Sequence, residues 1–167
     1  MRLSKLEVGA GRHVKEDDIV DSLEVRTAAM RALFTSDMAV VLAITSAGAF
    51  EVVTAVGSTP LPPVGSSVSG GINSLCGFAA QQSRAVIFEN VAATARFKGA
   101  QMATRFGAVS SLVVALRHRG TVVGVLGVHS RRARRYTAHE AQTLEHAIEG
   151  LAGQLAAAPL GPVSGAK

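Results

Sequence analysis

The sequence of 167 residues has few of the side chains that carry thiol chemistry or stack on bases. Cys76 is its only cysteine, which excludes an intrachain disulfide, a four-thiolate metal site and a dithiol redox pair. Tryptophan is absent and Tyr136 is the only tyrosine, so little aromatic surface is available for stacking nucleic-acid bases or sugars. These shortages argue against a dithiol oxidoreductase and against a single-strand nucleic-acid binder.

Long apolar runs are also missing. No run approaches the roughly 18 apolar residues that a membrane helix needs, and the first residues contain no apolar segment typical of a signal peptide. We therefore expect a cytoplasmic chain with no membrane partner. Hydrophobic residues make up 48% of the sequence and charged residues 17%, which is typical of a globular domain. The length fits one domain over residues 17–158, with a flexible extension over 1–16 and a disordered tail or linker over 159–167.

The excess of positive charge is small. The sequence has 17 lysines and arginines against 12 aspartates and glutamates, a formal net charge of +5. Four of the arginines stand close together between an apolar run and a capped helix: Arg131, Arg132, Arg134 and Arg135. They either bind an acidic partner or form a solvated corner between two elements. Because a nucleic-acid interface needs a wider basic surface, we expect no nucleic-acid partner.

Hydrophobic periodicity predicts helices and strands along the chain. Helices are expected over residues 18–35 and 69–82, and an irregular helical connection over 92–107. The apolar positions expected to face inward from the first two helices are Ile19, Leu23, Met30 and Leu33, then Ile72, Leu75, Cys76 and Ala79. Residues 57–71 are expected to form a loop, because three prolines and four glycines fall there.

Five strands are expected, over residues 38–45, 50–56 and 84–91 and as two β-branched runs within 109–130. The last two runs meet at Arg119-Gly120, a two-residue connection that suits a hairpin. Strands joined partly by hairpins, with helices at both ends, indicate an α+β domain with a largely antiparallel sheet.

The last helix has a clear start. Thr137 and Glu140 form the T-x-x-E capping box, in which each side chain binds a free amide of the first turn. Apolar residues then recur at steps of three and four, the pattern of a helix that packs along one seam. This seam is either core or a dimer contact, and we expect a homodimer through Leu144, Ile148, Leu151 and Leu155.

Two stretches resemble a known family, the GAF domain. Residues 105–158, RFGAVSSLVVALRHRGTVVGVLGVHSRRARRYTAHEAQTLEHAIEGLAGQLAAA, resemble the part of that family in which a variable segment leads into a strand, a hairpin, a second strand, a corner and the final helix. Residues 87–97, IFENVAATARF, are similar to its V-x-D-x-x-x-D-x-R-F pattern. The likeness covers residues 38–158 and is greatest to GAF modules of bacterial sensor histidine kinases and of cyclic-di-GMP turnover proteins with GGDEF or EAL domains.

The resemblance implies a PAS-related fold with a central antiparallel sheet of five or six strands. It places the N- and C-terminal helices on one face and a ligand cavity on the other, covered by residues 92–107, which we call the roof segment. The NKFDE signature of cyclic-nucleotide GAF modules and the Cys-His pair that holds bilins are not found. Free methionine sulfoxide reductases, which are also GAF proteins, use several cysteines, so we expect no enzymatic activity. No cofactor is indicated.

The candidate ligand-binding residues are mostly apolar, as a small-molecule pocket requires. They are Cys76, Phe78, Phe88, Phe97, Met102, Phe106 and Ser111. The same apolar residues would also serve as core, and Cys76 is either a packed hydrophobe or a reactive thiol. Further polar groups near the pocket are expected from Ser110, Thr104 and Arg105.

The histidines, His129 among them, are expected at the surface, and no metal site is expected because no pair has helical ligand spacing. The function favoured is a sensory or regulatory module that binds a small molecule and relays the signal through its terminal helices to an output domain or partner protein. The alternatives are a ligand-free dimerisation module and a redox sensor centred on Cys76.

Overall fold

The structure, a computed structural model, describes residues 16–97, 99 and 101–158. The expected extension, apart from Glu16, and the expected tail lie outside the described residues. The elements follow the chain as α1 (Glu16–Leu33), β1 (Met38–Ile44), β2 (Phe50–Gly57), β3 (Ser67–Val68), α2 (Leu75–Ala80), β4 (Val86–Phe88), α3 (Met102–Arg105), β5 (Ser110–His118), β6 (Thr121–Ser130), α4 (Ala138–Ala147) and α5 (Leu151–Ala157).

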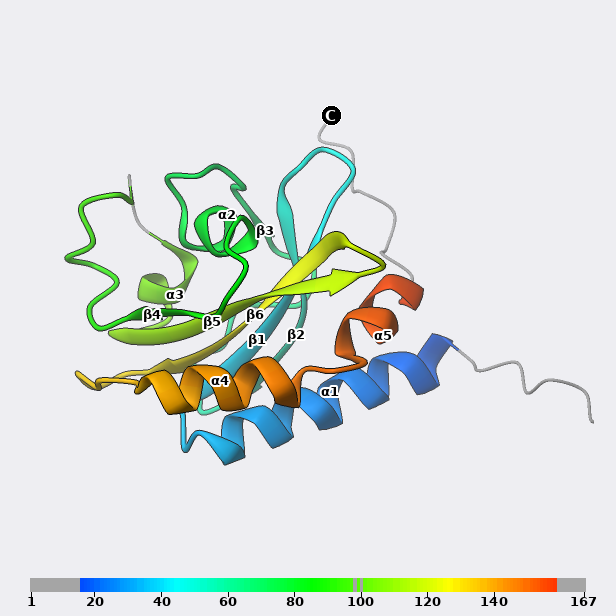
Figure 1. The fold of residues 1–167 in the computed structure, drawn as a ribbon, viewed down its shortest axis with the longest axis horizontal. Helices are drawn as coiled ribbons and strands as arrows, with labels where there is room; N and C mark the ends of the chain where they lie inside the picture. The colour runs from blue at the N-terminus through cyan, green and yellow to red at the C-terminus, as the bar shows by residue number, and fades with distance from the viewer. Residues whose placement is uncertain (1–15, 98, 100, 159–167) are drawn as a thin grey trace, which may run out of the picture.

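The strands form one antiparallel sheet of six strands in the order β3-β2-β1-β6-β5-β4. Helices α1, α4 and α5 cover one face, and α2 and α3 lie on the other (Figure 1). Each face buries its own apolar cluster, because successive residues of a strand point to opposite sides. In β5, for example, Leu112 and Val114 pack toward the terminal helices, whereas Val113 packs toward α2. The predicted α+β fold, an antiparallel sheet with the terminal helices on one face, is confirmed (Figure 1).

The hairpin predicted at Arg119-Gly120 is confirmed. β5 ends at His118 and β6 begins at Thr121, and the two turn residues have φ angles of 51° and 79°. Positive φ at both positions belongs to the tight turns whose twist matches that of paired strands. The hairpin therefore extends the two longest strands to one end of the sheet, far from the corner where β6 leads into α4 (Figure 1).

The capping box is also confirmed, but the last helix is broken. The Thr137 hydroxyl accepts from the Glu140 amide and the Glu140 carboxylate accepts from the Thr137 amide. The expected continuous helix ends at Ala147, and α5 starts after Gly150, whose φ of 79° is left-handed. A left-handed residue cannot continue a right-handed helix, so the chain changes direction here.

The residues of the predicted seam pack in the core of the single chain, which is the first of the two uses that the sequence left open. Leu144, Leu151 and Leu155 are buried on the sheet, and Ile148 packs against them. On α1 the same face buries Leu23 and Thr27, whereas Leu33 is 53% exposed, contrary to the prediction, and Phe34 is buried instead. The predicted inward position of Ile19 concerns a side chain that the structure does not describe.

The segments on the opposite face are shorter than predicted. The helix expected over 69–82 is limited to α2, so Ile72 is exposed rather than buried. The strand expected over 84–91 is limited to β4, and α3 is the only helical turn among the described residues of the roof segment. β3 lies within the expected loop, where it pairs with the start of β2. None of the described helices has the length and apolar character to cross a membrane.

Candidate functional site between β3 and α3

Two neighbouring spaces lie on the α2 and α3 face of the sheet. The inner cavity, between the sheet and α2, has a volume of about 10 Å³ and is lined by Cys76, Met102 and His129 among others. The outer cleft lies between residues 63–69, which include β3 and which we call the β3 segment, and α3. It has a volume of about 440 Å³. One water needs about 10–15 Å³, and small-molecule pockets usually measure about 300–1,000 Å³. Only the outer cleft therefore has room for an organic ligand.

Cys76 lies in α2 and borders the inner cavity. Burial raises the pKa of its thiol from 9.0 to about 12, because the charged thiolate would lose its hydration. A thiol is nucleophilic and metal-binding only as thiolate. Cys76 thus has the surroundings of a packed hydrophobe and not those of a reactive cysteine.

His129 lies on β6 and is only 2% exposed, so the expectation of a surface position is wrong. A hydrogen bond of 2.6 Å joins its Nδ1 to Ser111 Oγ on β5. Burial lowers the pKa of His129 to about 4, which keeps the imidazole neutral at physiological pH. The alternation of β6 gave a signal for this position, since His129 shares a sheet face with the buried Val125.

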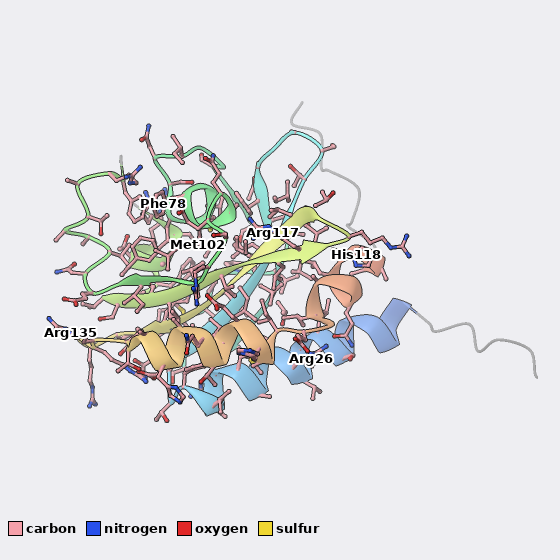
Figure 2. All side chains as sticks on the ribbon, in the orientation of Figure 1. Arg26, Phe78, Met102, Arg117, His118 and Arg135 are labelled. Carbon is pink, nitrogen blue, oxygen red and sulfur yellow. The ribbon has the colours of Figure 1, made fainter. Side chains whose placement is uncertain are left out.

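Three of the predicted site residues form an aromatic cluster beside the two spaces. The ring of Phe88 packs against Phe78 at 6.2 Å in an edge arrangement and against Phe97 at 5.3 Å between ring centroids. The guanidinium of Arg96 lies 4.4 Å from the centre of the Phe78 ring. Phe78 and Met102 are on the α2 and α3 side of the sheet, opposite Arg26 of α1 (Figure 2). These rings pack against one another and line neither space.

The lining of the outer cleft combines polar and apolar groups. Its main contributors are Ser67, Val68, Ser69, Gln101, Met102, Arg105 and Phe106. Of the candidate residues from sequence, Met102 and Phe106 line this cleft, and Cys76 and Met102 line the inner cavity. Phe78, Phe88, Phe97 and Ser111 border neither space directly. Arg105, expected as a nearby polar group, does lie in the cleft wall.

Gln101 lines both spaces, as do Val68 and Met102. It is buried, and its Oε1 accepts a hydrogen bond of 2.9 Å from the amide of Leu75, the first residue of α2. This bond fixes the start of α2 against the start of α3. Sequence reasoning missed Gln101, because a single glutamine in an irregular segment has no periodic pattern that marks it as buried.

The arginine cluster after β6 is mostly engaged within the chain. The Arg131 guanidinium donates to the carbonyls of Ser58 at 2.7 Å, Pro60 at 2.6 Å and Phe106 at 3.2 Å. Arg134 pairs with Glu140 at 2.6 Å.

Arg134 and Arg135 make two further contacts, with an aromatic ring and with a carboxylate. The Arg134 guanidinium also lies 4.3 Å from the centre of the Tyr136 ring, and Arg135 pairs with Glu89 at 3.0 Å on the surface. Three of the four arginines therefore brace the corner between β6 and α4, as the structural alternative predicted, and Arg132 is exposed. Across the described part of the chain, no three His, Cys, Asp or Glu side chains are grouped so that they could hold a metal ion.

The fold and the cleft define a class of α+β domain with terminal helices on one sheet face and a binding-sized space on the other. The model of the GAF domain family matches residues 18–158. The chain therefore belongs to the GAF domain family, whose members commonly act as sensory or regulatory modules of signalling proteins. No curated protein matches the chain.

Solved structures with the same fold come from proteins of different activities. The GAF domain of an Acinetobacter phosphoenolpyruvate-protein phosphotransferase is 22% identical, with a TM-score of 0.70 over 84% of this chain and 83% of its own. The GAF-B domain of DevS from Mycobacterium smegmatis is 20% identical, with a TM-score of 0.66 over 84% and 95%.

The similar structures also include enzymes. The type II free methionine-R-sulfoxide reductase of Thermoplasma acidophilum is 14% identical, with a TM-score of 0.70 over 86% of this chain and 96% of its own. At these identities the likeness shows the fold alone, and the fold occurs in both non-catalytic and catalytic proteins. Function has to be argued from the site itself.

Proposed function

We propose that this chain is a cytoplasmic sensory and regulatory module that binds a small molecule in the outer cleft and performs no chemistry on it. The observation that supports this most is the contrast in volume between the two spaces, about 440 Å³ against about 10 Å³. Most residues that line the inner cavity are buried, whereas the cleft is bordered by exposed residues that a ligand can reach, among them Ser69 and Arg105.

Arg131 provides a physical connection from the cleft to the terminal helices. Its guanidinium holds the carbonyl of Phe106, which lines the cleft, together with those of Ser58 and Pro60. Its backbone amide donates to Asp37 Oδ2 at 2.6 Å, between α1 and β1. A ligand that prefers one position of α3 would therefore bias the corner that leads into α4. For the ligand to act, its affinity must differ between the two arrangements.

The two alternatives have less support. A redox sensor needs an accessible thiolate, and Cys76 is buried with a raised pKa. A dimerisation module built on the seam of Leu144, Leu151 and Leu155 would need side chains that the monomer already buries. Regulation of an output domain or partner protein through the terminal helices remains part of the proposal.

A thermal-shift screen against small metabolites tests the proposed site. Ser69→Trp would fill the cleft, and Ser46→Trp places the same bulk in the exposed turn between β1 and β2 as a matched control. We expect at least one compound to raise the melting temperature of the wild type and of Ser46→Trp but not of Ser69→Trp. A screen in which every stabilising compound also stabilises Ser69→Trp, or in which no compound acts, would overturn the proposal.

A further inference from the structure

Arg105 stands out among the arginines on the cleft side of the sheet because its side chain has no partner among the described residues. Arg96 lies over Phe78, Arg131 holds three carbonyls, and Arg135 pairs with Glu89. The backbone amide of Arg105 donates to the Gln101 carbonyl at 3.2 Å, but no hydrogen bond, ion pair or ring contact joins its guanidinium to another residue that the structure describes. Its side chain is exposed and lines the outer cleft. A guanidinium has five donors in a planar fork that matches carboxylate and phosphate oxygens.

The rest of the polar lining also consists of groups that can donate to an anion. Ser67 and Ser69 are exposed at the cleft, and within the described residues neither hydroxyl forms a hydrogen bond. The two other serines are already engaged, Ser66 with the Pro63 carbonyl and Ser74 with the Gly71 carbonyl. No aspartate or glutamate is among the described residues that line the cleft. The charge of the described wall is therefore positive.

The lining also includes apolar side chains. Val68, Met102 and Phe106 contribute carbon surface next to the polar groups. A ligand that uses the whole cleft therefore needs a compact apolar body as well as a group that accepts hydrogen bonds. The volume of about 440 Å³ lies in the range of small-molecule pockets.

We infer that the outer cleft takes a small organic anion, with its carboxylate or phosphate group on Arg105 and the hydroxyls of Ser67 and Ser69 and its apolar body against Met102 and Phe106. The inference rests on the proposed function, since it names the chemical class of the ligand for the same site. Because the guanidinium of Arg105 can donate two parallel hydrogen bonds to a carboxylate or phosphate, the anionic group is the main feature by which the cleft would distinguish its ligand from neutral molecules.

Titration of the ¹⁵N-labelled full chain with three probes tests the inference. Phenyl phosphate and benzoate combine a ring with one anionic group, and benzyl alcohol has the ring without the charge. We expect the amides of Val68 and Met102 to shift with both anions, which bind about tenfold more tightly than the alcohol. Affinity for the anions, and not for the alcohol, should fall with added salt. The order of the two anions shows whether a phosphate or a carboxylate is preferred.

Two charge-matched variants locate the anion. Arg105→Gln should weaken both anions by about tenfold and leave the alcohol unchanged. Arg119→Gln removes the same charge at the hairpin turn, next to His118 and at the other end of the sheet from Arg135 (Figure 2), and should leave all three probes unchanged. An intact fold is checked from the shift dispersion of each variant.

The outcomes separate the two claims. If the alcohol binds in the cleft as tightly as the anions, the cleft remains a ligand site and the inference of an anion is wrong. The same holds if Arg105→Gln weakens all three probes equally. If no probe shifts the cleft residues at millimolar concentration, the inference fails, while the metabolite screen with Ser69→Trp decides the proposed function separately.

Discussion

At the scale of single residues, burial keeps two titratable groups beside the inner cavity uncharged. His129 and Cys76 both line this cavity, and burial moves the pKa of each in the direction that favours the neutral form. Because they are buried, these two side chains contribute to packing and are not accessible to a ligand. They are part of the packing behind the cleft, and the groups available to a ligand lie at the exposed positions of the β3 segment and α3.

The lowered pKa of His129 predicts a loss of stability in acid. Its pKa is 6.5 as an unperturbed group and about 4 in the folded chain. Below pH 6.5 the unfolded chain binds a proton that the folded chain does not, so stability falls as the pH drops from 6.5 to 4 and is fully present above 6.5. Denaturant unfolding at pH 7.5 and 4.5 should show that the wild type loses about 2–3 kcal/mol more than His129→Gln. Equal losses of stability in the two proteins would contradict the assignment of His129 as a buried, neutral side chain.

The raised pKa of Cys76 predicts an inert thiol. With a shift from 9.0 to about 12, the thiolate population is about a thousandfold smaller than in the unfolded chain. Ellman's reagent should therefore react slowly with native protein at pH 8 and at once in denaturant. Rapid reaction in native buffer would contradict the burial and revive the redox alternative.

The sequence predicted part of the lining of the outer cleft at this scale. Met102, Phe106 and Arg105 were expected near the ligand and do line the outer cleft, because the resemblance placed the cavity under the roof segment. Phe78, Phe88 and Phe97 were expected there as well, but they pack on one another. Composition does not distinguish an apolar residue that lines a pocket from one that fills it, since both need the same burial.

At the scale of elements, the break between α4 and α5 distinguishes the structure from the sequence pattern. The steps of three and four continue through residues 147–151, and a glycine within a periodic helix is usually tolerated at a modest cost. The pattern therefore predicted one helix. The capping box and the hairpin at Arg119-Gly120 were predicted correctly, because each depends on a few adjacent residues with a specific local geometry.

Substitution of Gly150 by alanine should change the free energy of unfolding in opposite directions for a continuous helix and for the observed break between α4 and α5. In a continuous helix, Gly150→Ala would stabilise by about 1 kcal/mol. At the observed φ of 79°, alanine should instead destabilise by about 1–2 kcal/mol, measured by denaturant unfolding. The added methyl would lie 3.5 Å from Arg26 Nη1, an ordinary contact, so the effect comes from the backbone.

Gly150→Asn serves as the control for this change. Asparagine tolerates the left-handed region better than alanine, so its loss should be smaller. A gain in stability for Gly150→Ala would show that the helix is continuous.

At the scale of the whole molecule, the terminal helices are held on the sheet by the residues first assigned to a dimer. Arg26 of α1 donates to Gln154 of α5 at 3.0 Å and to the carbonyl of Glu149, which adds a polar link between the two ends of the chain. The choice between core and dimer contact was open in the sequence, because an apolar seam looks the same in either use.

A pair of leucine substitutions tests this assignment. Leu151 is 1% exposed, so Leu151→Ala should lower the free energy of unfolding by about 2–5 kcal/mol and leave the oligomeric state unchanged. Leu33→Ala on the exposed side of α1 should change stability by less than about 0.5 kcal/mol. Light scattering after size exclusion measures the oligomeric state. A variant of Leu151 that converts a dimer into a stable monomer would restore the dimer seam.

Native mass spectrometry of freshly purified protein tests the central claim most directly, because it reports a bound molecule without requiring its identity. The wild type and Ser69→Trp are prepared in parallel, so that both meet the same cellular metabolites. The account predicts a retained non-covalent mass on the wild type that is absent from Ser69→Trp, since the indole occupies the cleft. The same bound mass on both proteins, or on neither, would contradict the outer cleft as the ligand site.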